Sequence, residues 1–127
     1  MIVSEKVYLE TINPVYASTQ RGVEELAKRI RDKLAKTLSA EVYVTEVITT
    51  NYIIREIYDR YLAIEEFGEA RFSVPIDYMI RFPGSDIEHI VTGAYMSVKI
   101  KKNEDNPVFK YVIIGELNVD LKQHPNR

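Results

Sequence analysis

The stretch RFSVPIDYMIRF at residues 71–82 decides the fold of this chain. Every second side chain in it is large and apolar: Phe72, Val74, Ile76, Tyr78, Ile80 and Phe82. Because side chains alternate between the two faces of a β-strand, this spacing predicts a strand with one buried face. Pro75 has no N–H to donate to a neighbouring strand, so we expect an edge strand, at least locally.

Two later segments repeat the alternation, residues 88–102 and 109–121. Turn-forming sequences separate the three segments, first Pro83-Gly84 and then the polar run at 103–107. The pattern therefore predicts three antiparallel strands joined by short turns. A slip of one residue would turn a whole apolar set outward, so matching the apolar faces restricts the register.

The alignment that keeps the apolar faces together pairs Phe82 with Glu88 and Lys102 with Pro107. Gly93 is a position where the first pairing can change. A bulge there would insert one extra residue into its strand and shift the part of the register beyond it.

Four further elements precede these strands and alternate in type: strand 2–9, helix 13–39, strand 41–49 and helix 51–68. Asn13-Pro14 would begin the first helix, since Asn caps well and Pro suits the first helical position. Gly22 lies inside that helix and costs about 1 kcal/mol relative to Ala. The second helix has apolar side chains in helical pairs: Ile53, Ile54, Ile57, Tyr58, Tyr61 and Leu62.

The predicted order is strand-helix-strand-helix-strand-strand-strand. It indicates an α+β fold, a curved and mainly antiparallel sheet of about five strands with two helices packed on one face. A chain of 127 residues has the length of one domain. We therefore expect a single domain at 1–127, with 122–127 as a short C-terminal tail.

The composition excludes several classes of protein. With 46% apolar and 28% charged residues, the chain is not of the disordered class. The lack of cysteine rules out disulfides, thiol nucleophiles and Cys-based metal sites. Two histidines, His89 and His124, are too few for a histidine-based metal site, and five scattered glycines form no phosphate-binding loop. We therefore expect no metal and no cofactor.

Location and source are also suggested by the sequence. No apolar run is long enough to span a bilayer and no signal peptide is visible, so we expect a cytoplasmic protein without membrane contact. Lys, Arg, Glu, Ile, Val and Tyr are plentiful while Gln and Cys are scarce, a bias typical of thermophiles. The bias favours a thermophilic archaeon or its virus as the source, with the host cytoplasm as the location of a viral protein.

The predicted register brings two pairs of ionisable side chains together on the outer face of the sheet. Asp77 and Glu116 would lie on either side of Gly93, and paired carboxylates beside apolar groups can act as acid and base. His89 and Asp120 would align as an oriented imidazole, although no nucleophile accompanies them. A small pocket enzyme is therefore one interpretation, and ordinary surface charge is its alternative.

An apolar strip on the same face favours a different function. Its members are Val91, Tyr95, Val112 and Ile114. Such a strip usually meets another element, another subunit or a ligand. Since no catalytic motif is present, we expect first a non-enzymatic interaction or structural protein that self-associates, with a homodimer favoured.

Two basic groups indicate nucleic-acid binding as a further alternative. They are Lys28, Arg29 and Arg31 on the first helix, and Lys99, Lys101 and Lys110 on the last hairpin. A basic β-ribbon can enter a DNA groove. Acidic residues interrupt the group on the helix and lie at the tip of the hairpin, and the net charge of −2 argues against a general nucleic-acid coat.

Overall fold

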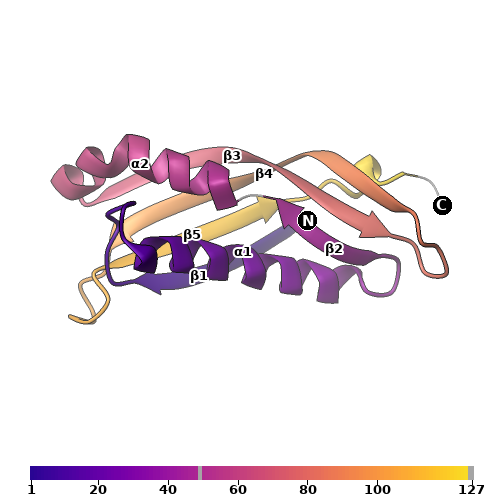
Figure 1. The fold of residues 1–127 in the computed structure, drawn as a ribbon, viewed down its shortest axis with the longest axis horizontal. Coiled ribbons are helices and arrows are strands. Elements are labelled where there is room, and N and C mark those ends of the chain that lie inside the picture. The colour runs from indigo at the N-terminus through magenta and orange to yellow at the C-terminus, as the bar shows by residue number, and fades with distance from the viewer. Residues whose placement is uncertain (49, 126–127) are drawn as a thin grey trace.

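The computed structural model describes residues 1–48 and 50–125. Its elements are β1 (Ile2–Leu9), α1 (Ala17–Leu38), β2 (Tyr43–Ile48), α2 (Thr50–Phe67), β3 (Glu69–Arg81), β4 (Glu88–Lys102), β5 (Tyr111–Asn118) and the 3-10 helix η1 (Leu121–Gln123) (Figure 1). The predicted α+β class and element order are confirmed. Thr49 of the second predicted strand and residues 126–127 of the predicted tail lie outside the described residues.

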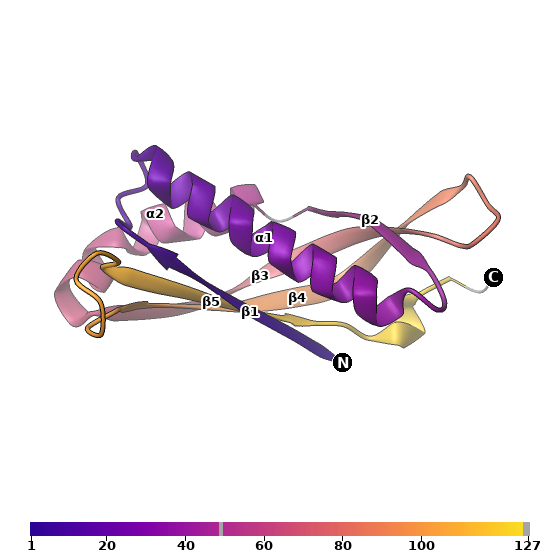
Figure 2. The same cartoon turned by 90° about the horizontal axis from the view of Figure 1, so that it is seen from below.

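The five strands form one antiparallel sheet in the order β1-β5-β4-β3-β2. Both helices pack on the same face, and α1 contacts both edge strands, β1 and β2. One helix can touch both edges only if the sheet curls around it, and Figure 2 shows α1 lying diagonally across the strands. Among the described residues, β2 pairs with β3 only from Asp77 to Arg81, so Pro75 lies on a locally free edge, as predicted.

The core fills the space between the helices and the inner face of the sheet. Fully buried side chains from both layers meet there: Leu26, Ile30, Leu34, Ile53, Ile57 and Ile64 from the helices, and Ile76, Tyr78, Ile80, Met96 and Ile113 from the sheet. Each aliphatic side chain of this size contributes about 1.5–3 kcal/mol when it is fully buried. This layer leaves the opposite face of the sheet uncovered by either helix.

The first helix begins later than the sequence predicted. Asn13 accepts a hydrogen bond from the backbone N–H of Val15 through its side chain (3.1 Å), and from Tyr16 N–H through its carbonyl (3.0 Å). These bonds close a turn, and α1 begins after it at Ala17. The Asn side chain is satisfied locally in an Asx-type turn, so Asn13-Pro14 forms the approach to the helix rather than its first turn.

A β-bulge divides the pairing of β3 with β4. Ile76 pairs with Ala94 as predicted, but the next pair is Tyr78 with Val91, which leaves Thr92 and Gly93 opposite Asp77. Gly93 has φ +87°, a left-handed conformation that glycine adopts without strain. The extra residue exchanges the two faces of β4 before the bulge, so Val91 points into the core and Ile90 points outward.

The predicted register of β4 with β5 is wrong by four residues. Lys102 pairs with Tyr111 rather than with Pro107. The loop between the strands is longer than predicted, and hydrogen bonds within it hold its shape. The side-chain amide of Asn103 donates to the carbonyl of Phe109 (3.1 Å), and its backbone N–H donates to the carbonyl of Lys110 (2.8 Å). A slip by an even number of residues keeps every side chain on its face, so apolar alternation does not detect it.

Candidate functional site

The outer face of the sheet presents four ordered rows of side chains. From the observed registers the rows across β3, β4, β5 and β1 are Glu69-Lys101-Val112-Tyr8, Arg71-Lys99-Ile114-Lys6, Ser73-Ser97-Glu116-Ser4 and Pro75-Tyr95-Asn118-Ile2. Successive rows are two residues apart along a strand, about 6.6 Å. We call these four rows the outer face.

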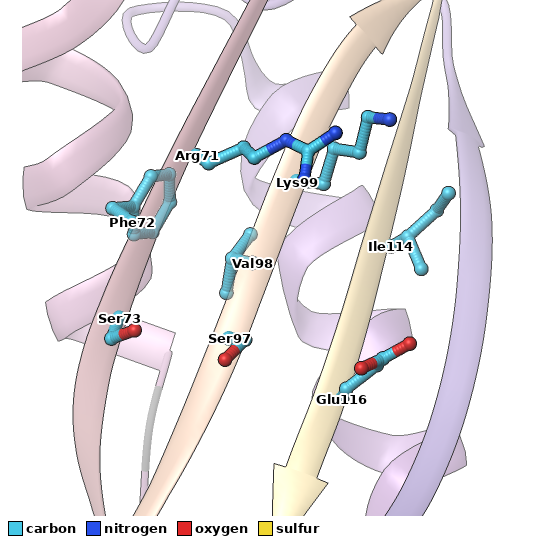
Figure 3. A pocket seen from close by; sticks show the side chains of 8 residues that line it. All are labelled: Arg71, Phe72, Ser73, Ser97, Val98, Lys99, Ile114 and Glu116. Carbon is cyan, nitrogen blue, oxygen red and sulfur yellow. The ribbon is translucent and has the colours of Figure 1, made fainter.

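The second and third rows border a hollow of about 470 Å³. Figure 3 shows Arg71 extending over β4 toward Lys99 at one end of it, with Ser73 and Ser97 side by side below them. Glu116, on the neighbouring strand β5, lies across from the two hydroxyls. The hollow exists because small serine side chains lie between rows of longer ones.

Two cations, Arg71 and Lys99, gather at one end of the hollow, and Lys99 has one carboxylate partner there. Arg71 and Lys99 are direct cross-strand partners, an arrangement that destabilises a sheet when the charges are alike. Lys99 forms an ion pair with Glu69, at 3.8 Å. Within the part of the chain that the structure describes, neither Arg71 nor Lys101 has an ion pair.

Lys6 adds a fourth cation from the edge strand β1. It occupies the same row as Arg71 and Lys99, on the far side of Ile114. Its ammonium lies 5.7 Å from the ring centre of Tyr8, close enough for a cation–π contact. The sequence did not single out Lys6 or Arg71. Arg71 could have been found because it alternates with the buried residues of its strand, whereas Lys6 required knowledge of the strand order.

The basic group on α1 is arranged differently. Arg29 pairs with Glu25 (3.1 Å), and Arg31 pairs with Asp32 (2.8 Å). Lys28 is exposed on the same helix, which covers the inner face of the sheet and lies opposite Lys99 and Lys101. Lys110 lies in the loop between β4 and β5. The two predicted basic groups therefore do not form one surface.

The predicted carboxylate pair is not assembled. Glu116 lies beside Ser97, whereas Asp77 lies opposite the bulge at Gly93. Gly93 and Ser97 are four residues apart on β4, about 13 Å at the rise of a strand. The expected acid–base pair depended on the incorrect β4–β5 register, and the distance is too long for the two groups to share a proton or a water.

The predicted pair of His89 and Asp120 is also not assembled. The bulge turns His89 toward the helix-covered face, where its ring lies 5.5 Å from that of Phe82. Asp120 caps η1 by accepting a hydrogen bond from Lys122 N–H at 3.0 Å. Neither set of candidate catalytic residues forms a common site.

The predicted apolar strip is only partly present. Val91 is 2% exposed and belongs to the core because of the bulge, so its assignment to an outer interface is wrong. Val112 is on the outer face but is buried in its row between Lys101 and Tyr8. Tyr95 is 47% exposed and Ile114 is half-buried, which leaves two separated apolar groups among polar ones.

Two tyrosines flank the basic and hydroxyl rows. Tyr95 stands in the fourth row, where its hydroxyl accepts a hydrogen bond from the side-chain amide of Asn118 at 3.1 Å. Tyr8 stands in the first row and is exposed. The outer face thus carries cations, hydroxyls and exposed aromatic rings, together with the carboxylates of Glu69 and Glu116.

A contact between Tyr78 and His124 fixes the C-terminal tail and was not predicted. The hydroxyl of Tyr78, whose side chain is in the core, forms a hydrogen bond with Nε2 of His124. Burial, followed by the charge of Asp120, raises the pKa of Tyr78 to about 12. Burial lowers the pKa of His124, with Glu41 acting in the opposite direction. The neutral histidine therefore accepts the bond from a protonated tyrosine.

This contact predicts loss of stability in weak acid. Because the folded state depresses the pKa of His124, its contribution is complete above the unfolded value of about 6.5 and is lost as pH falls through the folded value. We expect urea unfolding to give a smaller free energy at pH 5 than at pH 7.5. The decrease should be smaller in His124→Gln, which keeps a hydrogen-bonding side chain. Equal decreases in both proteins would assign the effect to carboxylates alone.

The described residues show neither a membrane-spanning helix nor a metal site. No helix among them has the length and apolarity needed to cross a membrane. The same residues contain no cluster of three or more His, Asp or Glu side chains suited to a metal ion. Comparison with protein-family models, curated proteins and solved structures gives no match. The chemistry of the outer face must therefore be inferred from its own side chains.

Proposed function

We propose that this protein binds single-stranded nucleic acid on the outer face of its sheet. The supporting observation is the direct cross-strand pairing of Arg71 with Lys99, at the rim of the hollow, in a chain whose net charge is −2. Lys99 is paired with Glu69, whereas Arg71 has no ion pair among the described residues, so the repulsion between these two cross-strand cations is only partly offset. A bound phosphate would remove that repulsion, and Lys6 and Lys101 extend the positive surface on either side.

The remaining side chains fit the other parts of a nucleotide. Ser73 and Ser97 can donate hydrogen bonds to phosphate or sugar oxygens, as such hydroxyls commonly do. Tyr8 and Tyr95 offer exposed rings on which bases can stack. An open sheet with outward aromatic and basic residues is a recurrent platform for single strands, whose bases are free to stack.

Double-stranded DNA fits this surface less well. A protein element that enters a DNA groove is a helix or a protruding β-ribbon. The β4–β5 hairpin could serve as such a ribbon, but its loop contains Glu104 and Asp105, whose charges would be repelled by the DNA phosphates. The basic side of α1 has the shape for a groove, but Arg29 and Arg31 are already paired with carboxylates. Binding through the outer face would therefore favour the single strand.

Self-association through the outer face has less support than the sequence suggested. Charged residues are depleted from the centres of protein interfaces, whereas Arg71, Lys99 and Glu116 line the hollow at the centre of this face. Val91, the first residue of the predicted strip, is in the core. The exposed side of α2 has better support as a surface for self-association.

The proposal predicts salt-dependent binding by the native protein. Fluorescence anisotropy with a labelled 12-nucleotide DNA strand should give micromolar affinity at 50 mM salt. If four cations contact phosphates, the slope of log K against log salt should be about −3, since each contact on a single strand contributes about −0.7. An unlabelled duplex of the same sequence should compete at least 10-fold less well. Absence of binding at 50 mM salt, or a preference for the duplex, would refute the proposal.

A further inference from the structure

The outward side of α2 exposes an apolar patch on the helical side of the molecule. Leu62 is 77% exposed and Tyr58 is 66% exposed, one turn apart on the helix. Val15, 80% exposed, and its neighbour Tyr16 come from the segment before α1. A hollow of about 300 Å³ lies between these two segments, lined in part by Pro14, Val15, Tyr58 and Leu62.

Tyr58 and Leu62 belong to the apolar residues whose helical spacing predicted α2, but they do not lie on its buried side. Ile53, Ile57 and Ile64 make the buried stripe instead, with Ile54 and Tyr61 at its border. A large apolar side chain is common on a protein surface when it is isolated. Several of them beside a hollow indicate a contact surface.

The spacing along α2 indicates what covers the patch. Five positions follow one another at intervals of four, three, four and three residues: Asn51, Arg55, Tyr58, Leu62 and Glu65. This is the heptad spacing of a helix-to-helix seam, in which Arg55 and Glu65 carry opposite charges on the two sides of the central pair Tyr58 and Leu62. Arg55 and Glu65 are both exposed.

The seam is self-complementary in one orientation only. If two copies of α2 pack antiparallel about a two-fold axis, Tyr58 meets Leu62 of the partner subunit, and Arg55 meets Glu65 of the partner subunit. A parallel arrangement would instead oppose like charges at both ends. Glu65 is held in place because its carboxylate accepts the hydrogen bond from the Tyr111 hydroxyl at 2.6 Å.

We infer that α2 forms the interface of a homodimer with two-fold symmetry, in which the two α2 helices pack antiparallel. Tyr58 or Leu62 of the partner subunit enters the hollow beside Val15. Each copy contributes the same patch, as a closed two-fold interface requires. An interface made by a few side chains from one helix of each copy is a small one, so we expect micromolar dissociation. It lies away from the outer face, and a dimer can form whether or not nucleic acid binds.

The test is sedimentation velocity of the full chain between 2 and 200 μM, roughly the range in which a small interface of this kind dissociates. The native protein should pass from monomer to dimer, and Leu62→Glu should remain monomeric with an unchanged circular dichroism spectrum, because Leu62 contributes little to the core. Val108→Glu is the matched control, since Val108 is 62% exposed in the β4–β5 loop, and it should dimerise normally.

A charge exchange tests the orientation. Arg55→Glu should weaken the dimer about 10-fold, and adding Glu66→Arg should recover most of that loss, since Glu66 is exposed beside Glu65 and leaves the Tyr111 bond intact. A native protein that is monomeric throughout the range would overturn the inference. So would a dimer that survives Leu62→Glu but dissociates with Ile114→Glu, because that result would place the interface on the outer face.

Discussion

The double substitution Arg71→Gln/Lys99→Gln should lower the affinity for a single-stranded 12-mer about 100-fold at 100 mM salt. Each cation would lose one charge-assisted contact with a phosphate, worth about 1.5 kcal/mol or slightly more. The slope of log K against log salt should also become shallower by about 1.4, because two fewer counterions are released. Anisotropy measurements at four salt concentrations determine both quantities.

The fold should survive this change, because it removes a repulsion between cross-strand partners. The matched control is Arg21→Gln/Lys28→Gln, which removes one arginine and one lysine from exposed positions of α1 on the other side of the sheet. It should reduce affinity less than threefold. Equal losses in the two double variants would mean that binding depends on overall charge and that the outer face is not the site.

Gly22→Ala should destabilise the protein by about 1–2 kcal/mol, although alanine is the better helix former. A Cβ added at Gly22 would lie 2.0 Å from Cδ2 of Leu9, which is fully buried on β1. Because Leu9 is fully buried, we expect the upper part of the range for overpacking, about 2–3 kcal/mol, and subtracting the gain of about 1 kcal/mol in helix propensity leaves this net loss. Thermal unfolding should show a midpoint lowered by about 4–8 °C.

A double-mutant cycle identifies the cause. Leu9→Ala alone should cost about 2–5 kcal/mol by leaving a cavity. In that background Gly22→Ala should be neutral or stabilising, because the clash is gone and the helix gain remains. If Gly22→Ala costs the same with either residue at position 9, close packing of α1 on β1 is not the reason for the glycine.

The order of the elements could be predicted because each segment has an internal pattern. Alternation in residues 71–82 and 88–102 identifies β3 and β4, and helical spacing identifies α1 and α2. Pro75 also predicted correctly that β3 has a free edge, since the missing N–H is a local property of one residue. These features depend on covalent structure and short-range sterics alone.

The candidate site could not be predicted to the same extent because it depends on the register between strands. The bulge at Gly93 sends Val91 and His89 to the inner side, and the longer β4–β5 loop moves Glu116 away from Asp77 and beside Ser97. An even slip preserves the apolar face, so the sequence pattern is equally compatible with both pairings. The sequence pattern therefore leaves the cross-strand partners of the functional residues undetermined. The hydrogen bonds that Asn103 makes in the β4–β5 loop accompany the register that the protein adopts.

The sequence by itself determined the α+β class and the element order, because these follow from side-chain periodicity along one segment at a time. Only the tertiary structure decided that Arg71, Lys99 and Lys6 share a row, and that Tyr58 and Leu62 face outward. The physical reason is that both arrangements depend on how separate segments dock. The register of neighbouring strands and the side that a helix turns toward the sheet are set by loop geometry and by the close packing of side chains throughout the core.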